Sequence, residues 1–166
     1  MGSPTRSDSV LLQNALAYWH RIRGGRHLPL RADFDPSEVP ALLPYVIVVD
    51  VLRDPPDFQY RLLGTAIDRV LGSDYRGRRY SELSYTKPGT PIWDEHTRVV
   101  AEQTPLRSSV AYVGHDRAVQ KAEHVLMPFS DAGETVDMLL AVVAVKLRPA
   151  IQVPELRPRT VTASRA

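Results

Sequence analysis

The chain has 166 residues and a formal net charge of +2, and its 43% hydrophobic and 24% charged residues are typical of a globular domain. It contains no cysteine, which excludes disulfides, cysteine-ligated metal sites and cysteine nucleophiles. No apolar run is long enough to cross a bilayer and the first residues are polar, so we expect a soluble cytoplasmic protein with no membrane partner.

The first predicted element is a helix. After a flexible start over residues 1–8, it would be capped by Asp8 or Ser9, because both side chains can accept a hydrogen bond from the first turn. It would end at Gly24, since glycine tolerates the left-handed conformation that closes a helix. This helix opens an N-terminal helical extension that we place over residues 9–44.

Within this extension, Asp35 precedes a proline and predicts one more short helix. From residue 45 the apolar side chains no longer recur at helical spacing. Residues 45–52 are β-branched and almost continuously apolar, which predicts a strand covered on both faces. Residues 58–63 alternate apolar and polar side chains and predict a half-buried strand, joined to the first by a proline-containing turn.

The second half is predicted to contain helices and then strands. Two short helices are expected at 66–71 and 79–83, and a longer one from Pro91, with Thr90 as its cap. Three alternating segments then predict a three-stranded meander over residues 106–113, 118–129 and 135–147. Residues 148–166 show no periodicity and are rich in Pro and Arg, so we expect a flexible tail.

This element order predicts an α+β fold with a five-stranded antiparallel sheet. Hairpin connections pair strands one and two, and also strands three, four and five. The long crossover lets the last strand lie beside the first, in the spatial order 2-1-5-4-3. The two most apolar strands then become the central pair, as burial requires.

The layout resembles a PAS domain with a core over residues 45–147. Gly72 and Gly77 match the glycine spacing that PAS domains generally carry between their first two short helices. The front of the chain is similar to a bacterial subfamily of compact, stand-alone PAS proteins. The segments that carry this likeness are Tyr18-Trp19, Arg23 to Arg26, Pro29, Asp33 to Pro36, Leu42 to Pro44, Phe58 to Thr65, Pro128, Gly133-Glu134 and Val136-Asp137.

The resemblance implies a non-enzymatic sensory, signalling or protein-interaction module with a cavity between its sheet and its short helices. About 19 residues follow the last predicted strand, fewer than a domain needs. We therefore expect the protein to act in trans through a separate, unidentified signalling partner. The cavity could bind a small apolar ligand.

Alternation on the strands and the helix faces gives the predicted inward-facing side chains. These could contact a ligand or simply fill a core, and a register error of one residue would invert them. They are Phe58, Tyr60, Leu62, Ile67, Leu71, Val100, Val110, Tyr112, Val125, Met138 and Leu140.

The first helix carries an apolar stripe that can cover the outer face of the sheet. Its members are Leu11, Leu12, Leu16 and Trp19. In many PAS proteins such a helix also forms the dimer contact, so the resemblance implies a homodimer. Packing within one chain is the alternative, and both can hold at once.

The five histidines do not predict a metal site, because no two of them have the sequence separation that is usual for two ligands of one metal ion. His96 lies on the long helix, where haem-binding PAS domains carry their iron ligand, so the resemblance allows a haem held by His96. His115-Asp116 is assigned to a hairpin tip rather than a catalytic pair. Glu123 and His124 fall on opposite faces of one strand and should not form a dyad.

Two other functions stay open. In one, a scaffolding domain with a filled core uses its basic ends to dock an acidic partner or nucleic acid. Nucleic acid is not favoured as the partner, because the positive charge lies outside the predicted core. The densest basic cluster contains Arg21, Arg23, Arg26 and Arg31, with His20 and His27. In the other, an enzyme would use His96 or His124 in the cavity. No catalytic or phosphate-binding motif supports an enzyme.

Overall fold

The computed structural model describes residues 6–110 and 119–147, and the side chains of residues 10–109 and 121–146. The helix α1 spans Arg6–Arg23 and so begins before the predicted caps. Gly24 follows it with a φ of 57°, as expected for a glycine that closes a helix. The chain then makes three short 3₁₀ turns, η1 at Arg31–Asp33, η2 at Pro36–Glu38 and η3 at Leu43–Tyr45.

The remaining elements follow the predicted order. The strands β1 and β2 form a hairpin and are followed by α2, the 3₁₀ turn η4 and α3, whose predicted Thr90 cap accepts a hydrogen bond from the backbone N–H of Trp93. Three further strands complete the sheet. The bounds are β1 Val46–Arg53, β2 Pro56–Leu63, α2 Thr65–Leu71, η4 Tyr80–Glu82, α3 Pro91–Glu102, β3 Leu106–Val110, β4 Val119–Phe129 and β5 Met138–Leu147.

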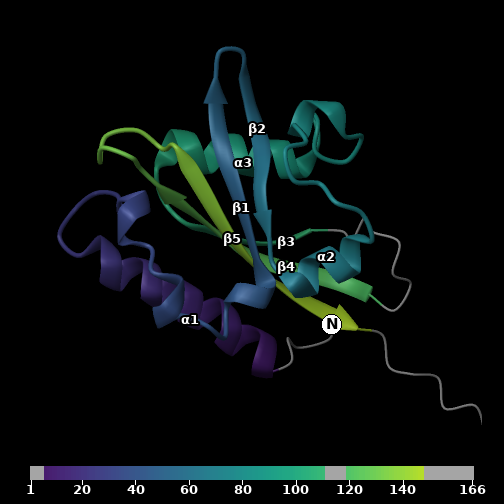
Figure 1. The fold of residues 1–166 in the computed structure, drawn as a ribbon, viewed down its shortest axis with the longest axis horizontal. Helices are drawn as coiled ribbons and strands as arrows, with labels where there is room; N and C mark the ends of the chain where they lie inside the picture. Colours follow the sequence, from purple (N-terminus) through teal and green to yellow (C-terminus); the bar gives the residue numbers. More distant parts are fainter. Residues whose placement is uncertain (1–5, 111–118, 148–166) are drawn as a thin grey trace, which may run out of the picture.

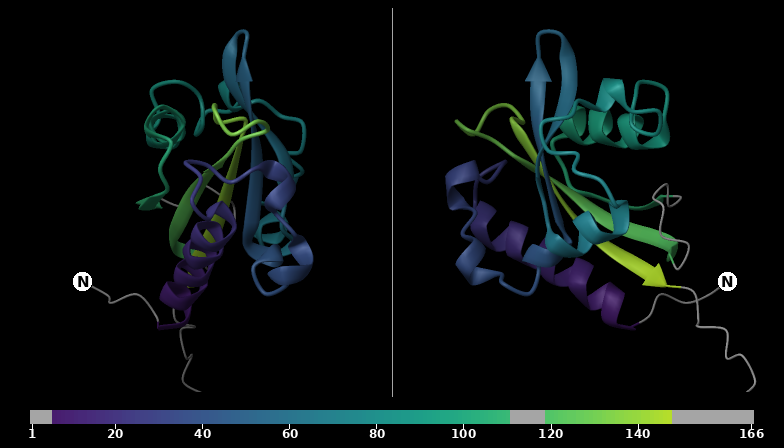
Figure 2. Two further views of the ribbon diagram at one scale, coloured as in Figure 1. Left: turned by 90° about the vertical axis from the view of Figure 1, so that its left-hand side faces the viewer. Right: turned by 45° about the vertical axis from the view of Figure 1, so that its right-hand side comes forward.

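The sheet is antiparallel and its strand order is β2-β1-β5-β4-β3, which confirms the predicted topology and fold class. The helix α1 and the helix α3 lie on opposite sides of β5 (Figure 1; Figure 2). The apolar strand β5 therefore runs through the middle of the molecule, between β1 and β4.

The α1 face of the sheet is closed by the chain itself. The side chains of Leu12 and Trp19 are 1% and 2% exposed, because α1 packs along β4 and β5. The Trp19 indole Nε1–H donates a hydrogen bond of 2.8 Å to the carbonyl oxygen of Pro128. Leu11 and Leu16 are half-buried at the margin of the same contact. Packing of α1 within one chain thus buries Leu12 and Trp19 of the stripe.

Candidate ligand pocket

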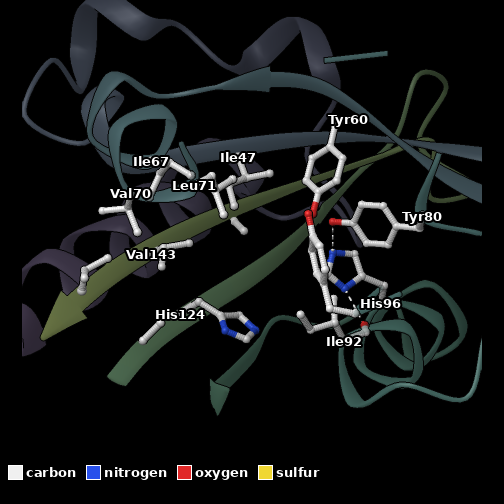
Figure 3. Close-up of a pocket in the computed structure, with 14 residues that line it drawn as sticks. Ile47, Tyr60, Ile67, Val70, Leu71, Tyr80, Ile92, His96, His124 and Val143 are labelled. Carbon is white, nitrogen blue, oxygen red and sulfur yellow. Dashed lines mark hydrogen bonds between the residues drawn. The ribbon is translucent and has the colours of Figure 1, made fainter. Parts of the chain in front are cut away.

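A cavity of about 110 Å³ lies between the other face of the sheet and the elements α2, η4 and α3. Side chains from four strands, β1, β2, β4 and β5, and from the helices α2 and α3 surround it (Figure 3). The residues that line it are Ile47, Tyr60, Ile67, Val70, Leu71, Tyr80, Tyr85, Ile92, His96, Ala122, His124, Ala141, Val143 and Val145.

The two ends of the cavity differ in chemistry. Aliphatic side chains from α2 and from the strands, among them Leu71 and Val143, surround one end (Figure 3). At the other end, the hydroxyl groups of Tyr60 and Tyr80 approach one another beside the His96 imidazole (Figure 3). The cavity is therefore apolar along most of its wall and carries neutral hydrogen-bonding groups at one end.

The His96 ring has both nitrogens in hydrogen bonds. Its Nδ1 lies 2.8 Å from the Ile92 carbonyl oxygen, one turn earlier in α3, and its Nε2 lies 3.0 Å from the Tyr80 hydroxyl. A carbonyl oxygen only accepts, so Nδ1 carries the proton and Nε2 accepts from Tyr80. This arrangement leaves no nitrogen available for iron, and the residues present do not fit the haem that the position of His96 suggested.

Burial also determines the charge of His96. Loss of hydration lowers the pKa of its imidazole from 6.5 to about 4, although the hydrogen bond to the Ile92 carbonyl opposes this shift. The ring is therefore neutral at physiological pH. It offers the cavity a neutral, fully hydrogen-bonded group instead of a cation.

This pKa predicts a pH-dependent stability. Because the folded pKa lies below the unfolded value, the unfolded chain binds more protons between pH 6.5 and 4, and the free energy of unfolding falls as the pH falls through this range. A shift of this size corresponds to about 3 kcal/mol. We expect urea denaturation at pH 7, 5.5 and 4 to show this loss, and the variant His96→Asn to show a smaller one. An identical pH dependence in His96→Asn and in the exposed control His20→Asn would contradict the assignment.

A second polar group borders the cavity. The Glu95 carboxylate on α3 has one oxygen 3.0 Å from Nε2 of His124 on β4, and its other oxygen accepts a hydrogen bond from the Ser108 hydroxyl on β3. The His124 side chain is 8% exposed. Burial acts to raise the pKa of Glu95, but His124 and Ser108 outweigh it, so this pKa lies below its usual value. The carboxylate is therefore ionised at neutral pH and ties α3 to two strands.

The order of these three side chains does not match that of a hydrolytic triad. A serine nucleophile needs an imidazole that takes its proton, with the carboxylate on the far side of the imidazole. Here the carboxylate of Glu95 lies between Ser108 and His124. The contact therefore fits a structural link better than an activated nucleophile. Glu123, the preceding residue of β4, pairs with Lys121 and Arg107.

The structure places the predicted ligand residues differently from one another. Tyr60, Ile67 and Leu71 line the cavity. Phe58 is buried directly behind the wall, where its ring contacts those of Tyr80, Trp93 and His96, and Val100 is half-buried on α3 away from the lining.

The remaining described residues of the set face away from the cavity. The predicted inward orientation of Leu62 is wrong, because its side chain is 46% exposed. A β-bulge explains the error: Val48 pairs with Leu62 but Val49 pairs with Tyr60, so Arg61 is an extra residue and the alternation reverses after it.

The residues predicted to face the cavity from β4 and β5 lie on the opposite face of the sheet. Val125, Met138 and Leu140 are buried, but the cavity is lined by their neighbours of opposite parity, such as His124 and Ala141. In a strand, side chains alternate between faces, so the predicted residues belong to the α1 side. Both faces of these strands are apolar, and periodicity could not assign them.

Several predicted positions cannot be placed. Val110 pairs with Ala122 in the β3–β4 ladder, but its side chain is not described. Tyr112 and the His115-Asp116 pair lie outside the described residues.

Within residues 6–110 and 119–147, no three His, Asp or Glu side chains gather as a metal site would require. No helix in this part of the chain is both long and apolar enough to cross a membrane.

Comparison with known proteins identifies a family. A family model described as a PAS domain matches residues 7–144. No curated protein matches the chain. The chain is similar to a PAS domain of the histidine kinase ThkA, with 13% identity and a TM-score of 0.44 over 60% of this chain and 97% of that one.

Two further solved structures are similar. One is a fungal LOV domain photoreceptor, with 12% identity and a TM-score of 0.46 over 85% of this chain and 95% of that one. The other is the PAS domain of an HTR-like protein from Haloarcula marismortui, with 19% identity and a TM-score of 0.42 over 66% of this chain and 96% of that one.

Proposed function

The chain belongs to the PAS domain family, whose members are generally sensory or signalling modules, and we propose that it senses a small apolar molecule held between its sheet and its helices. The observation that carries this proposal is the cavity of about 110 Å³ with its largely aliphatic wall. Family membership supports a non-catalytic role, since PAS domains are typically non-catalytic.

The size and polarity of the cavity suit one small organic molecule. An apolar protein cavity of about 150 Å³ stays dry and takes up a molecule the size of benzene. The cavity here is of the same order. Filling it would recover the contacts that its wall lacks, so an apolar compound is bound more readily than water.

The position of the cavity supports a signal passed to a partner. His124 lines it and contacts Glu95, which is hydrogen-bonded to Ser108 in the edge strand β3. A ligand that displaces His124 would alter the contact of α3 with this edge. We propose that another protein, or a second copy of this chain in a homodimer, responds to that change.

The alternative scaffold has less support. A filled core is at odds with the cavity, and three arginines of the basic cluster are paired with carboxylates of the same chain. The pairs are Arg21 with Glu38 at 3.0 Å, Arg26 with Asp33 at 2.6 Å and Arg31 with Asp50 at 3.0 Å. Paired charges present a weaker attraction to an acidic partner.

Thermal unfolding with benzene as the probe tests the proposal. At about ten times its Kd, benzene should stabilise the native protein by about 1.4 kcal/mol, a rise in melting temperature of about 3 °C. The variant Ala141→Leu fills the cavity and should lose this rise, whereas the control Ala101→Leu, at an exposed position of α3, should keep it. Equal stabilisation of all three proteins would refute a ligand in this cavity.

Native mass spectrometry of protein purified without added ligand complements this test. Extra mass that is lost on denaturation would give the size of the natural ligand. The same spectrum distinguishes a monomer from the proposed homodimer.

A further inference from the structure

The polar end of the cavity contains one buried hydroxyl group that has no hydrogen-bond partner among the described residues. Three tyrosines, Tyr60, Tyr80 and Tyr85, line it together with His96. The Tyr60 and Tyr80 rings lie 4.7 Å apart between centroids, and their hydroxyl groups point at the same place (Figure 3). A phenol has one proton to donate, so this end holds three donors.

Two of these hydroxyl groups have acceptors beside them, since Tyr80 donates to His96 and the Tyr80 oxygen can accept the Tyr60 proton. The Nδ1–H of His96 is held by the Ile92 carbonyl, so Nε2 is an acceptor and the Tyr80 hydroxyl donates to it over 3.0 Å. The Tyr85 hydroxyl oxygen is buried and has no hydrogen-bond partner among the described residues. A buried polar group without a partner costs about 1–3 kcal/mol and is therefore rare in folded proteins.

We infer that the cavity selects an uncharged, ring-sized compound with one carbonyl oxygen, which accepts a hydrogen bond from the hydroxyl group of Tyr85. This inference rests on the proposed function, because it names the class of ligand for the same cavity. The ring would occupy the aliphatic end beside Leu71 and Val143, and the oxygen would lie at the tyrosine end.

The charges around the cavity explain why the compound is uncharged. No Lys, Arg, Asp or Glu side chain among the described residues lines it, so neither a carboxylate nor an ammonium group would find a counter-ion. The Glu95 carboxylate lies 3.0 Å from His124, which lines the cavity, and would repel an anion. The neutral ring of His96 does not compensate for it.

The protonation of the tyrosines explains the preference for an acceptor. Burial raises the pKa of Tyr60 to about 12, and burial is also the main cause that raises the pKa of Tyr85. Both remain phenols at neutral pH and donate. A carbonyl oxygen has lone pairs and no proton, so it can accept the Tyr85 proton without needing an acceptor of its own.

The experiment measures the Kd of three probes of matched shape by isothermal titration: acetophenone, ethylbenzene, which lacks the oxygen, and benzoate, which is charged. We expect acetophenone to bind about tenfold more tightly than ethylbenzene, the effect of a satisfied hydrogen bond. Benzoate should bind more weakly than both. In Tyr85→Phe, acetophenone should weaken to the level of ethylbenzene, and ethylbenzene should be unchanged.

The control variant is Tyr45→Phe, since Tyr45 is half-buried in η3 and does not line the cavity; it should keep the full preference for acetophenone. Tyr85→Phe removes an unpartnered hydroxyl and should fold normally, so its result is interpretable. Equal binding of acetophenone and ethylbenzene to the native protein, or tighter binding of benzoate, would overturn the inference and leave an apolar pocket standing. Binding of none of the three would overturn both proposals.

Discussion

We expect Gly64→Ala to destabilise the protein by about 3 kcal/mol or more, a large part of the stability of an ordinary domain. Gly64 joins β2 to α2, and a Cβ atom at this position would lie 2.4 Å from the carbonyl oxygens of both Leu43 and Pro44. These oxygens belong to the backbone of η3, so no side-chain rotation can relieve the overlap. The Gly64 N–H also donates to the Val46 carbonyl over 2.8 Å, which holds the two backbones together.

Urea denaturation at pH 7 measures this loss, and Gly25→Ala is the matched control. Gly25 has no atom within 4 Å of the added methyl group and no positive φ, so its variant should change the free energy of unfolding by less than about 0.5 kcal/mol. If Gly64→Ala is as stable as Gly25→Ala, the close approach of η3 to the end of β2 is refuted.

The sheet was predictable because its strands differ in their apolar patterns. β5 is continuously apolar and β2 alternates, so the first had to be central and the second could lie at an edge. With hairpins at both ends, this left one compact order, which the structure has. The α3 cap at Thr90 was predictable for a local reason, since threonine before Pro91 offers an acceptor to the first turn.

The wall of the cavity was only partly predictable. The bulge at Arg61 inserts one residue into β2, and nothing in the alternation before it signals that Leu62 turns outward. In β4 and β5 both faces are apolar, because one packs on α1 and the other on the cavity. Val125 and Leu140 are therefore indistinguishable by pattern from residues that line the wall.

The polar contacts of the site depend on tertiary structure. Glu95, Ser108 and His124 belong to three different elements, and no sequence spacing brings them together. Tyr80 and His96 meet for the same reason. Aligning β3 with β4 as a hairpin would have placed Ser108 opposite His124, but it gives no position for Glu95.

We expect Trp19→Ala to lower the free energy of unfolding by about 4 kcal/mol, the usual cost of removing a buried tryptophan. The Trp19 side chain is 2% exposed where α1 meets the sheet, and its indole N–H satisfies the Pro128 carbonyl. The truncation would leave a cavity under α1 and remove a hydrogen bond at the same time. Equilibrium unfolding in urea, followed by far-ultraviolet circular dichroism, gives the loss directly.

Two further variants separate these contributions. Trp19→Phe keeps most of the apolar contact but leaves the Pro128 carbonyl without its donor, so it should cost about 1–2 kcal/mol. Val10→Ala changes a side chain of α1 that is 47% exposed and should cost less than about 0.5 kcal/mol. Because Trp19 is buried by its own chain, the loss in Trp19→Ala should not vary with protein concentration. A loss that grows on dilution would instead place this tryptophan in a contact between subunits, since only association makes stability depend on concentration.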